Sequence, residues 1–285
     1  MTALREAAQR KGALVSRLIM SPDHSGRPAV VVEGSKDLPL FRSLLGEPGS
    51  YVLVDAGSRT TAIEVVEEVH KRNIPALAIV DSDDELVCGP SQRREAAIIT
   101  TDLRDIEAMM FMSPVGDRLI ADILDPDAVK GIEGERGCPL KEVIISELSV
   151  VGAARAVNYR EDFRIRFKDV DVCRFLDANR VRVDEEAYVR ALVQASSRRP
   201  SFGAFNAAVA QLRESVDPSH LLPGHDLTRL LSALCRGRLG APGAPSADSL
   251  ELALRVGYSN EYFRQTNLYR RLSAWSGKRN MCLVA

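Results

Sequence analysis

Residues 29–34 read Ala-Val-Val-Val-Glu-Gly, a short apolar run that ends abruptly in an acid and a glycine. Two similar runs follow, Tyr51-Val52-Leu53-Val54-Asp55 and Ala76-Leu77-Ala78-Ile79-Val80, and residues 96–101 form a fourth. Amphipathic or apolar segments with helical spacing lie between them, at residues 38–45 and 60–72. Strands that are apolar on both faces and alternate with helices are typical of a parallel sheet covered on both sides. Residues 28–113 are therefore expected to form an α/β domain.

The remainder of the chain is expected to be mainly helical. A helix is expected over the first ~20 residues, followed by a turn-rich break at residues 21–28. Further helices are expected at residues 140–158, 184–195, 204–216, 226–235 and 249–269, with one β-like run at 163–167 and a linker at 240–246. The expected organisation is an N-terminal helix and turn (1–27), the α/β domain (28–113), a helical region packed on it (114–239) and a C-terminal helical segment (240–285).

The composition excludes several classes of protein. With 45% hydrophobic and 27% charged residues, the 285-residue chain is neither disordered nor collagen-like. Its 38 basic and 39 acidic residues nearly cancel, so nucleic-acid binding would have to come from a local patch. The apolar runs are shorter than the ~20 residues that span a bilayer, so no membrane association is expected. The dispersed cysteines and the absence of a signal-peptide core predict a reduced, cytoplasmic setting.

Acidic residues follow each of the expected strands. In an open parallel sheet, ligands bind outside the carboxyl ends of the strands, which is where these acids lie. Converging carboxylates repel one another, and a hard divalent cation such as Mg²⁺ or Mn²⁺ removes that cost. The acids nearest to the strand ends are Glu33, Asp37, Asp55, Asp81, Asp83 and Asp102.

Simpler interpretations compete with a metal site. Asp37 and Asp105 could each cap the start of a helix. For Asp81 and Asp83, which directly follow a buried run, a functional site is the favoured interpretation. A haloacid-dehalogenase-like site needs its Asp-x-Asp after the first strand, and a phosphoreceiver needs an acid pair there; neither pattern fits this sequence.

A strand ending in Glu-Gly, a helix, and Asp-x-Asp after the third strand resemble a Toprim domain, which topoisomerases, bacterial primases and overcoming-lysogenization-defect (OLD) nucleases share. Residues 31–37, Val-Val-Glu-Gly-Ser-Lys-Asp, are similar to the OLD-type variant of the first motif. Residues 101–107, Thr-Asp-Leu-Arg-Asp-Ile-Glu, and the Gly-His-Asp segment at 224–226 resemble signatures of an uncharacterised-domain subfamily with a lone Toprim domain. That subfamily includes the Toprim effector nuclease of the PARIS anti-phage system, which works with a separate ABC-type ATPase.

The resemblance implies a Toprim-like parallel sheet, a Mg- or Mn-dependent phosphodiesterase activity and a set of site residues. Glu33 and Asp37 match the first acidic motif, and Asp81 and Asp83 match the second. Arg104, Asp105 and Glu107 match the subfamily segment, with Glu107 completing the ion shell. His225 lies where many relatives have Lys, and a neutral imidazole does not replace an ammonium; Asp226 follows it.

Phosphodiester hydrolysis also needs cations that face the phosphate. Lys36, Arg104 and Lys168 are the candidates, and each could equally be a solvated side chain. The stretch from Arg155 to Lys168 is the best candidate for an electropositive track, with a solvated surface as its alternative. A second basic run, residues 264–279, could contact nucleic acid or a partner protein.

Three functions remain open from the sequence. The first is a metal-dependent endonuclease acting on DNA or RNA, in the setting of anti-phage defence. The second is a catalytically silent Toprim module that binds a partner ATPase or nucleic acid. The third is nucleotidyl transfer as in primases, although no zinc-binding companion domain is evident. The sequence contains no Walker-type Gly-Lys-Ser/Thr loop, so any ATP dependence would come from a partner.

Overall fold

A computed structural model describes residues 2–20, 27–47, 49–89, 96–237, 239–240, 243–279 and 283–284. The chain divides into two compact units, and each is described by itself. The sheet unit comprises residues 1–82, 92–102 and 259–285. The helical unit comprises residues 83–91 and 103–258.

The sheet unit is built on a four-stranded parallel sheet with the strand order β2-β1-β3-β4. The strands are β1 (Ala29–Val32), β2 (Val52–Asp55), β3 (Ala76–Val80) and β4 (Ile98–Thr100). Every residue of the central strands β1 and β3 is buried, as strands covered on both faces require. These positions agree closely with the runs that the sequence predicts.

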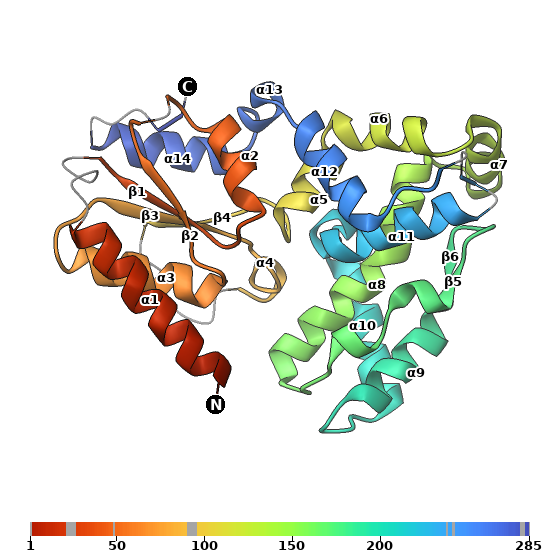
Figure 1. The fold of residues 1–285 in the computed structure, drawn as a ribbon. Coiled ribbons are helices and arrows are strands. Elements are labelled where there is room, and N and C mark those ends of the chain that lie inside the picture. Colours follow the sequence, from red (N-terminus) through yellow and green to blue (C-terminus); the bar gives the residue numbers. More distant parts are fainter. Residues whose placement is uncertain are drawn as a thin grey trace. The chain divides into compact units, whose positions relative to one another are not determined.

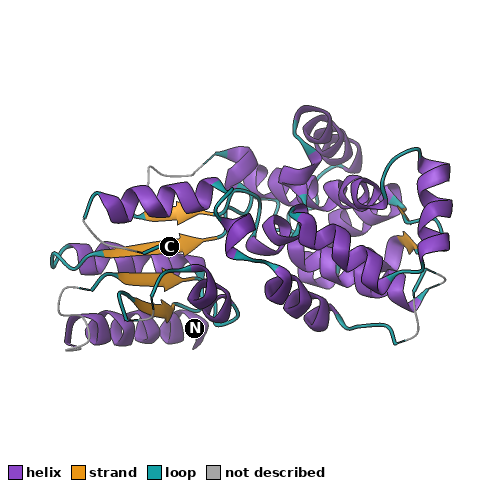
Figure 2. Cartoon of the chain, turned by 90° about the horizontal axis from the view of Figure 1, so that it is seen from above, coloured by secondary structure: helices purple, strands orange, loops and turns teal. Residues whose placement is uncertain are grey.

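Helices cover both faces of this sheet (Figures 1 and 2). On one face lie α3 (Arg59–His70) and, packed against it, α1 (Thr2–Met20). On the other face lie α2 (Asp37–Leu44) and α14 (Asn267–Gly277), with α13 (Asn260–Phe263) next to α2. The predicted fold class, a parallel α/β sheet flanked by helices and followed by a mainly helical region, is confirmed.

The turn between β2 and α3 has a specific requirement for glycine. Gly57 has φ +80°, and a Cβ atom there would lie 2.8 Å from the guanidinium carbon of Arg10 on α1. The same guanidinium pairs with Asp55 at the end of β2, so it occupies the space beside the turn. Ser58 then caps α3 by accepting a hydrogen bond from the Thr61 N–H at 3.2 Å.

The C-terminal segment returns to the sheet and packs on its edge strand β4. Arg271 of α14 donates hydrogen bonds to the carbonyl of Thr100 and, at 3.3 Å, to its hydroxyl. Asp102, just after β4, accepts from the Asn267 N–H at 2.5 Å. Burial lowers the pKa of Arg271, and Asp102 opposes that effect.

The helical unit is organised around α8 (Leu140–Glu161), a 22-residue helix that is buried along most of its length. Before it come α4 (Glu85–Cys88), α5 (Ile106–Met112), α6 (Pro114–Ile123) and α7 (Pro126–Arg136). After it come the hairpin strands β5 (Leu176–Asp177) and β6 (Arg182–Val183), and then α9 (Glu185–Ala195), α10 (Phe202–Ser215), α11 (Gly224–Arg236) and α12 (Ala247–Gly257). Gly152 lets the chain at Leu221 approach α8, because a Cβ there would lie 1.8 Å from the Leu221 carbonyl oxygen.

Two sequence expectations are wrong. The helix expected at residues 249–269 is divided into α12, α13 and α14, because Ser259 and Thr266 occupy the N-cap positions of new helices. The β-like run at 163–167 is not a strand of a sheet: Arg164 has φ +55°, which breaks the extended backbone, and Ile165 forms only an isolated bridge to Ser196. Residues 21–26 of the expected turn, residues 241–242 of the expected linker, and Cys282 lie outside the described residues.

Candidate functional site

Two of the predicted acids meet at the carboxyl edge of the sheet. Glu33 is the first residue after β1, and Asp81 is the first residue after β3, the strand paired with β1. The Glu33 Oε2 atom accepts a hydrogen bond from the Asp81 N–H at 3.4 Å. The chain beyond Asp81 is fixed by Ser82, whose N–H donates to Thr101 Oγ1 at 2.9 Å at the end of β4. Glu33 and Asp81 therefore occupy neighbouring strand ends, as the sequence predicts.

Asp37 turns back toward the same end of β1. Its Oδ2 atom accepts from the Gly34 N–H at 2.9 Å, and its own N–H donates to the Gly34 carbonyl at 3.1 Å. These bonds close the turn between β1 and α2. Asp37 is the first residue of α2, and its carboxylate fixes the turn before the helix instead of capping the helix N–H groups. Its carboxylate nevertheless lies at the turn that carries Glu33. Lys36 is exposed at the N-cap position of α2, where its side chain makes no capping bond.

The acids after the other two strands are tied to basic side chains of the same unit. Asp55 after β2 pairs with Arg10, and Asp102 after β4 lies 3.7 Å from Arg271. We define the acid edge of the sheet unit as Glu33, Asp37 and Asp81, the acids that follow the paired central strands β1 and β3.

Asp83 and Asp84 open the first segment of the helical unit. Asp83 has φ +49°, a left-handed conformation that Asp tolerates better than most residues and that is enriched at functional sites. Its N–H donates to the Arg104 carbonyl at 2.7 Å. The buried Arg104 side chain donates to Asp84 at 2.6 Å. Burial acts to lower the pKa of Arg104, but Asp84 and further carboxylates outweigh it and raise that pKa.

Asp105 and Gly224, which are far apart in sequence, are in contact in the helical unit. Asp105 caps α5 by accepting from the Ala108 N–H at 2.8 Å, and it also accepts from the Gly224 N–H at 2.7 Å. A Cβ atom on Gly224 would lie 2.4 Å from both Asp105 Oδ1 and Glu107 Cβ, so only glycine allows this approach. Burial, followed by the charge of Glu107, raises the pKa of Asp105 to about 6. The two segments that carry the subfamily resemblance thus lie together.

A second acidic group, which we call the buried acid cluster, consists of Glu107, Glu251 and His225. Their potential ligand atoms all lie within 4.8 Å of one another, and both glutamates are buried. Arg255 donates to Glu107 at 3.0 Å and to Glu251 at 3.2 Å. His225 Nδ1 is 3.8 Å from Glu251 Oε1 on a mostly exposed side chain. Glu251 and Arg255 are not evident as site residues from the sequence, because an i,i+4 acid–base pair on a helix ordinarily marks a solvated face.

Asp226 and the predicted basic track are paired internally. Arg155 donates to the buried Asp226 at 2.8 Å, and its guanidinium lies 4.7 Å from the centre of the Phe167 ring. Arg166 pairs with Asp169 at 2.9 Å, and Arg164 lies 3.5 Å from Asp162. Lys168 is exposed on the short helical turn at 167–169. The acids in this stretch therefore balance much of the charge that a phosphate track would need.

Comparison with protein-family models, with curated proteins and with solved structures finds no match to this chain. Among the described residues, every helix is either too short or too polar for a membrane crossing.

Proposed function

We propose that the chain is a metal-dependent phosphodiesterase of the Toprim type, a nuclease that hydrolyses DNA or RNA. The observation that carries this proposal is the contact of the Glu33 carboxylate with the Asp81 N–H at 3.4 Å, at the carboxyl edge of a parallel sheet. Open α/β sheets bind their ligands at this edge, and phosphoryl transfer commonly uses divalent ions held there by carboxylates.

The donor atoms of the acid edge fit a hard divalent cation. Glu33, Asp37 and Asp81 offer carboxylate oxygens, the ligands that Mg²⁺ and Mn²⁺ prefer, and Asp83 follows two residues after Asp81. A bound ion would supply an activated water and relieve the charge of the phosphoryl oxygens. Asp37 also fixes the turn that carries Glu33, so it acts as a positioning residue as well as a ligand. Lys36 is the basic residue of that turn and would face substrate phosphate.

Glu107 is a weaker candidate ligand than the resemblance implies. Its carboxylate already accepts a hydrogen bond from Arg255, a mostly buried cation on α12. Ion binding at Glu107 would therefore require Arg255 to be displaced or to share the carboxylate. We assign the ion to the acid edge, Glu33, Asp37 and Asp81.

The proposed setting is anti-phage defence together with an ABC-type ATPase. This part rests on the resemblance of residues 31–37, 101–107 and 224–226 to the lone-Toprim subfamily and on the absence of a Walker-type loop from the sequence. The check is whether an ATPase encoded beside this chain co-purifies with it and alters cleavage.

A catalytically silent binding module is the second candidate. The internal pairing of Arg104 with Asp84 and of Arg155 with Asp226 favours it, because those cations are engaged within the protein. Both candidates use the same fold, so activity has to be argued from the site.

The test is cleavage of plasmid, single-stranded DNA and tRNA with Mg²⁺ or Mn²⁺, using the parent chain, Glu33→Ala and Glu67→Ala. Glu67 is an exposed acid of α3 in the same unit and serves as the matched control. We expect the parent and Glu67→Ala to cleave and Glu33→Ala to be inactive while unfolding at the parent's temperature. A folded and fully active Glu33→Ala variant would contradict the proposal. A parent that binds Mn²⁺ but cleaves none of the three substrates would favour the silent module.

A further inference from the structure

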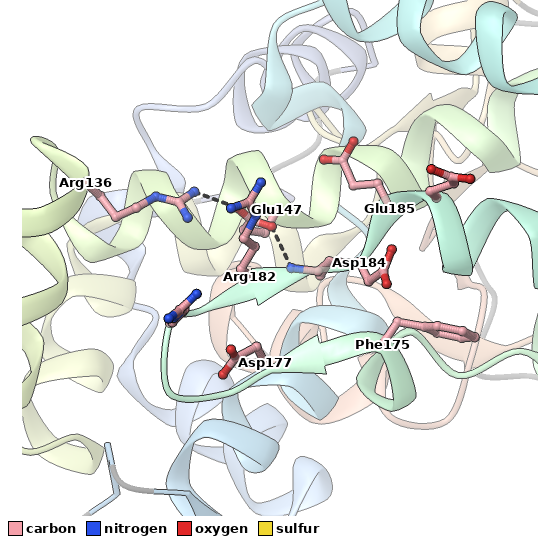
Figure 3. Close-up of a pocket in the computed structure, with 10 residues that line it drawn as sticks. Arg136, Glu147, Phe175, Asp177, Arg182, Asp184 and Glu185 are labelled. Atoms are coloured by element: carbon pink, nitrogen blue, oxygen red, sulfur yellow. Dashed lines mark hydrogen bonds and ion pairs between the residues drawn. The ribbon is translucent and has the colours of Figure 1, made fainter.

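The helical unit contains a pocket of about 820 Å³ at the hairpin β5–β6 (Figure 3). Its wall is formed by the hairpin, by Arg136 at the end of α7, by Glu147 of α8 and by the start of α9. This volume lies within the range of pockets that hold small organic ligands. No residue of the pocket belongs to the acid edge or to the buried acid cluster.

Charged side chains of both signs line this pocket. Arg136 and Arg182 lie toward one side, with the carboxylate of Glu147 between them, whereas Asp184, Glu185 and the ring of Phe175 lie toward the other (Figure 3). Asp177 lies on the hairpin between the two sides. Such an arrangement suits a ligand that has an anionic group at one end and hydrogen-bond donors with an aromatic face at the other.

The acids of the pocket have partners within the protein. Glu147 accepts from Arg136 at 2.5 Å and from the Val183 N–H at 2.8 Å. Two acids pair with arginines outside the pocket, Glu185 with Arg213 and Glu186 with Arg190, each at 2.6 Å. Asp177 and Asp184 accept backbone N–H groups at 3.0 Å.

Arg180 and Arg182 differ from the acids of the pocket in the contacts of their side chains. Within the part of the chain that the structure describes, neither guanidinium makes an ion pair or a hydrogen bond, although both line the pocket. An arginine fork presents several N–H donors in the geometry that a phosphate group accepts. The pocket therefore offers two guanidinium groups whose hydrogen-bonding capacity is available to a ligand.

The residue between these arginines holds the hairpin in a strained shape. Val181 has φ +48°, an unfavourable conformation for a β-branched residue, and its side chain is fully buried. Backbone strain of this kind persists only where the surroundings enforce it, and it clusters at ligand-binding segments. The buried Val181 thus anchors the loop, with Arg180 and Arg182 placed on either side of it.

We propose that this pocket binds a 5′-phosphorylated nucleotide unit. Arg180 and Arg182 bind the phosphate, and Phe175 contacts the base through its aromatic face. The carboxylate of Asp184 accepts hydrogen bonds from ribose hydroxyl groups, a role that acidic residues have in other nucleotide sites. The Arg136–Glu147 pair forms the wall between the two ends and keeps Val183 of β6 in place. The ligand is either a free nucleotide or the phosphorylated end of a nucleic-acid strand.

Titration calorimetry at low salt tests this site with adenosine monophosphate, a 5′-phosphorylated dinucleotide, adenosine and inorganic phosphate. We expect the nucleotide probes to bind at least ~10-fold more tightly than adenosine or phosphate alone. Replacing one charged donor typically weakens binding by about 10-fold to 100-fold, so Arg180→Ala and Arg182→Ala should each do so. Tighter binding of the dinucleotide would identify a strand end as the natural ligand. Tighter binding of the mononucleotide would identify a free nucleotide.

Matched variants separate this pocket from other charged surfaces. Arg198→Ala removes an exposed arginine of the same unit that pairs with Asp162 outside the pocket, so it should leave nucleotide affinity unchanged. Phe175→Leu should weaken the binding of adenosine monophosphate without changing the binding of inorganic phosphate. Because the proposed phosphate contacts are arginine side chains, nucleotide binding should persist in EDTA and in Glu33→Ala, whatever the fate of the proposed nuclease activity.

Three results would overturn the proposal. The first is a parent chain that binds neither nucleotide probe at millimolar concentration. The second is an Arg180→Ala/Arg182→Ala double variant that is folded, as shown by its thermal unfolding, and retains the parent's affinity. The third is equal affinity for phosphate and nucleotides, which would reduce the pocket to an anion site.

Discussion

The acid edge of the sheet unit and the buried acid cluster of the helical unit differ in the groups that donate hydrogen bonds to their carboxylates. At the acid edge, Glu33 and Asp37 accept hydrogen bonds from backbone N–H groups. In the buried acid cluster, Glu107 and Glu251 share the guanidinium of Arg255. The shared arginine satisfies the carboxylate oxygens and also cancels their charge inside the protein, which suits a structural role for the buried acid cluster.

Among the variants that test this comparison, Arg255→Met is expected to have the largest effect on the free energy of unfolding. Removing the cation leaves two buried carboxylates facing each other, and losing one partner of a buried ion pair costs about 3–5 kcal/mol of unfolding free energy. Urea unfolding measures this loss. The control is Arg166→Met, which breaks an exposed pair and should cost at most about 1 kcal/mol. Equal, small losses in both variants would show that the buried acid cluster does not depend on Arg255.

A pH dependence is expected from Asp105. Its pKa is about 6 in the folded protein against an ordinary value of 3.8, so the folded state binds the proton more tightly than the unfolded state does. Its contribution to stability is therefore fully present below pH ~4, and it is lost as the pH rises through about 6. The total change is at most roughly 3 kcal/mol.

Urea unfolding between pH 4 and 7 in EDTA, with Asp105→Asn for comparison, measures this contribution. The Asn variant cannot titrate, so the decline with pH should be shallower even if its overall stability is lower. Parallel curves for the two proteins would contradict the raised pKa.

Gly224→Ala should destabilise the helical unit by about 1–3 kcal/mol, the range typical of overpacking. The added Cβ would lie 2.4 Å from atoms of Asp105 and Glu107, and it would push α11 away from α5. Gly134→Ala on α7 is the matched control, because nothing lies within 4 Å of its Cβ position. That control should gain about 0.5–1 kcal/mol from helix propensity. The midpoint temperature of thermal unfolding should therefore fall in Gly224→Ala and rise in Gly134→Ala.

The smallest effect on stability is expected at the acid edge. Asp81→Asn removes one charge from a group of neighbouring carboxylates, so the metal-free protein should be unchanged or slightly more stable, by less than about 1 kcal/mol. The same variant should lose Mn²⁺ binding in calorimetry. Undiminished Mn²⁺ affinity in Asp81→Asn would show that the ion binds elsewhere in the protein.

The sheet was largely predictable from the sequence, because its information is local. The runs that precede Glu33 and Asp81 are short and apolar at every position, as strands covered on both faces require. Their acidic ends then lie at one edge as a geometric consequence of parallel pairing. Asp55 and Asp102 have the same local pattern, but their pairing with Arg10 and Arg271 depends on tertiary contacts that no local pattern specifies.

The helical unit was less predictable from the sequence, because its important contacts join residues that are far apart in the chain. Resemblance related the segments at Asp105 and Gly224, but their contact joins residues that are 119 positions apart. Glu251 and Arg255 have the i,i+4 spacing of a solvated pair. Glu251 is nevertheless buried and Arg255 is mostly buried, because α12 packs against α5 and α11. The hairpin at Val181 was missed because its strands are two residues long and its turn places valine in a conformation that sequence patterns assign to glycine or asparagine.

The return of residues 259–285 to the sheet unit has a consequence for synthesis on the ribosome. Strand β4 is an edge strand, and its Thr100 carbonyl is bound by Arg271 of α14, which is translated more than a hundred residues later. A nascent chain halted at residue 258 would expose that edge as a template for pairing with other chains. Such a product should aggregate where the full chain does not, and sedimentation of the two after cell-free translation measures the difference.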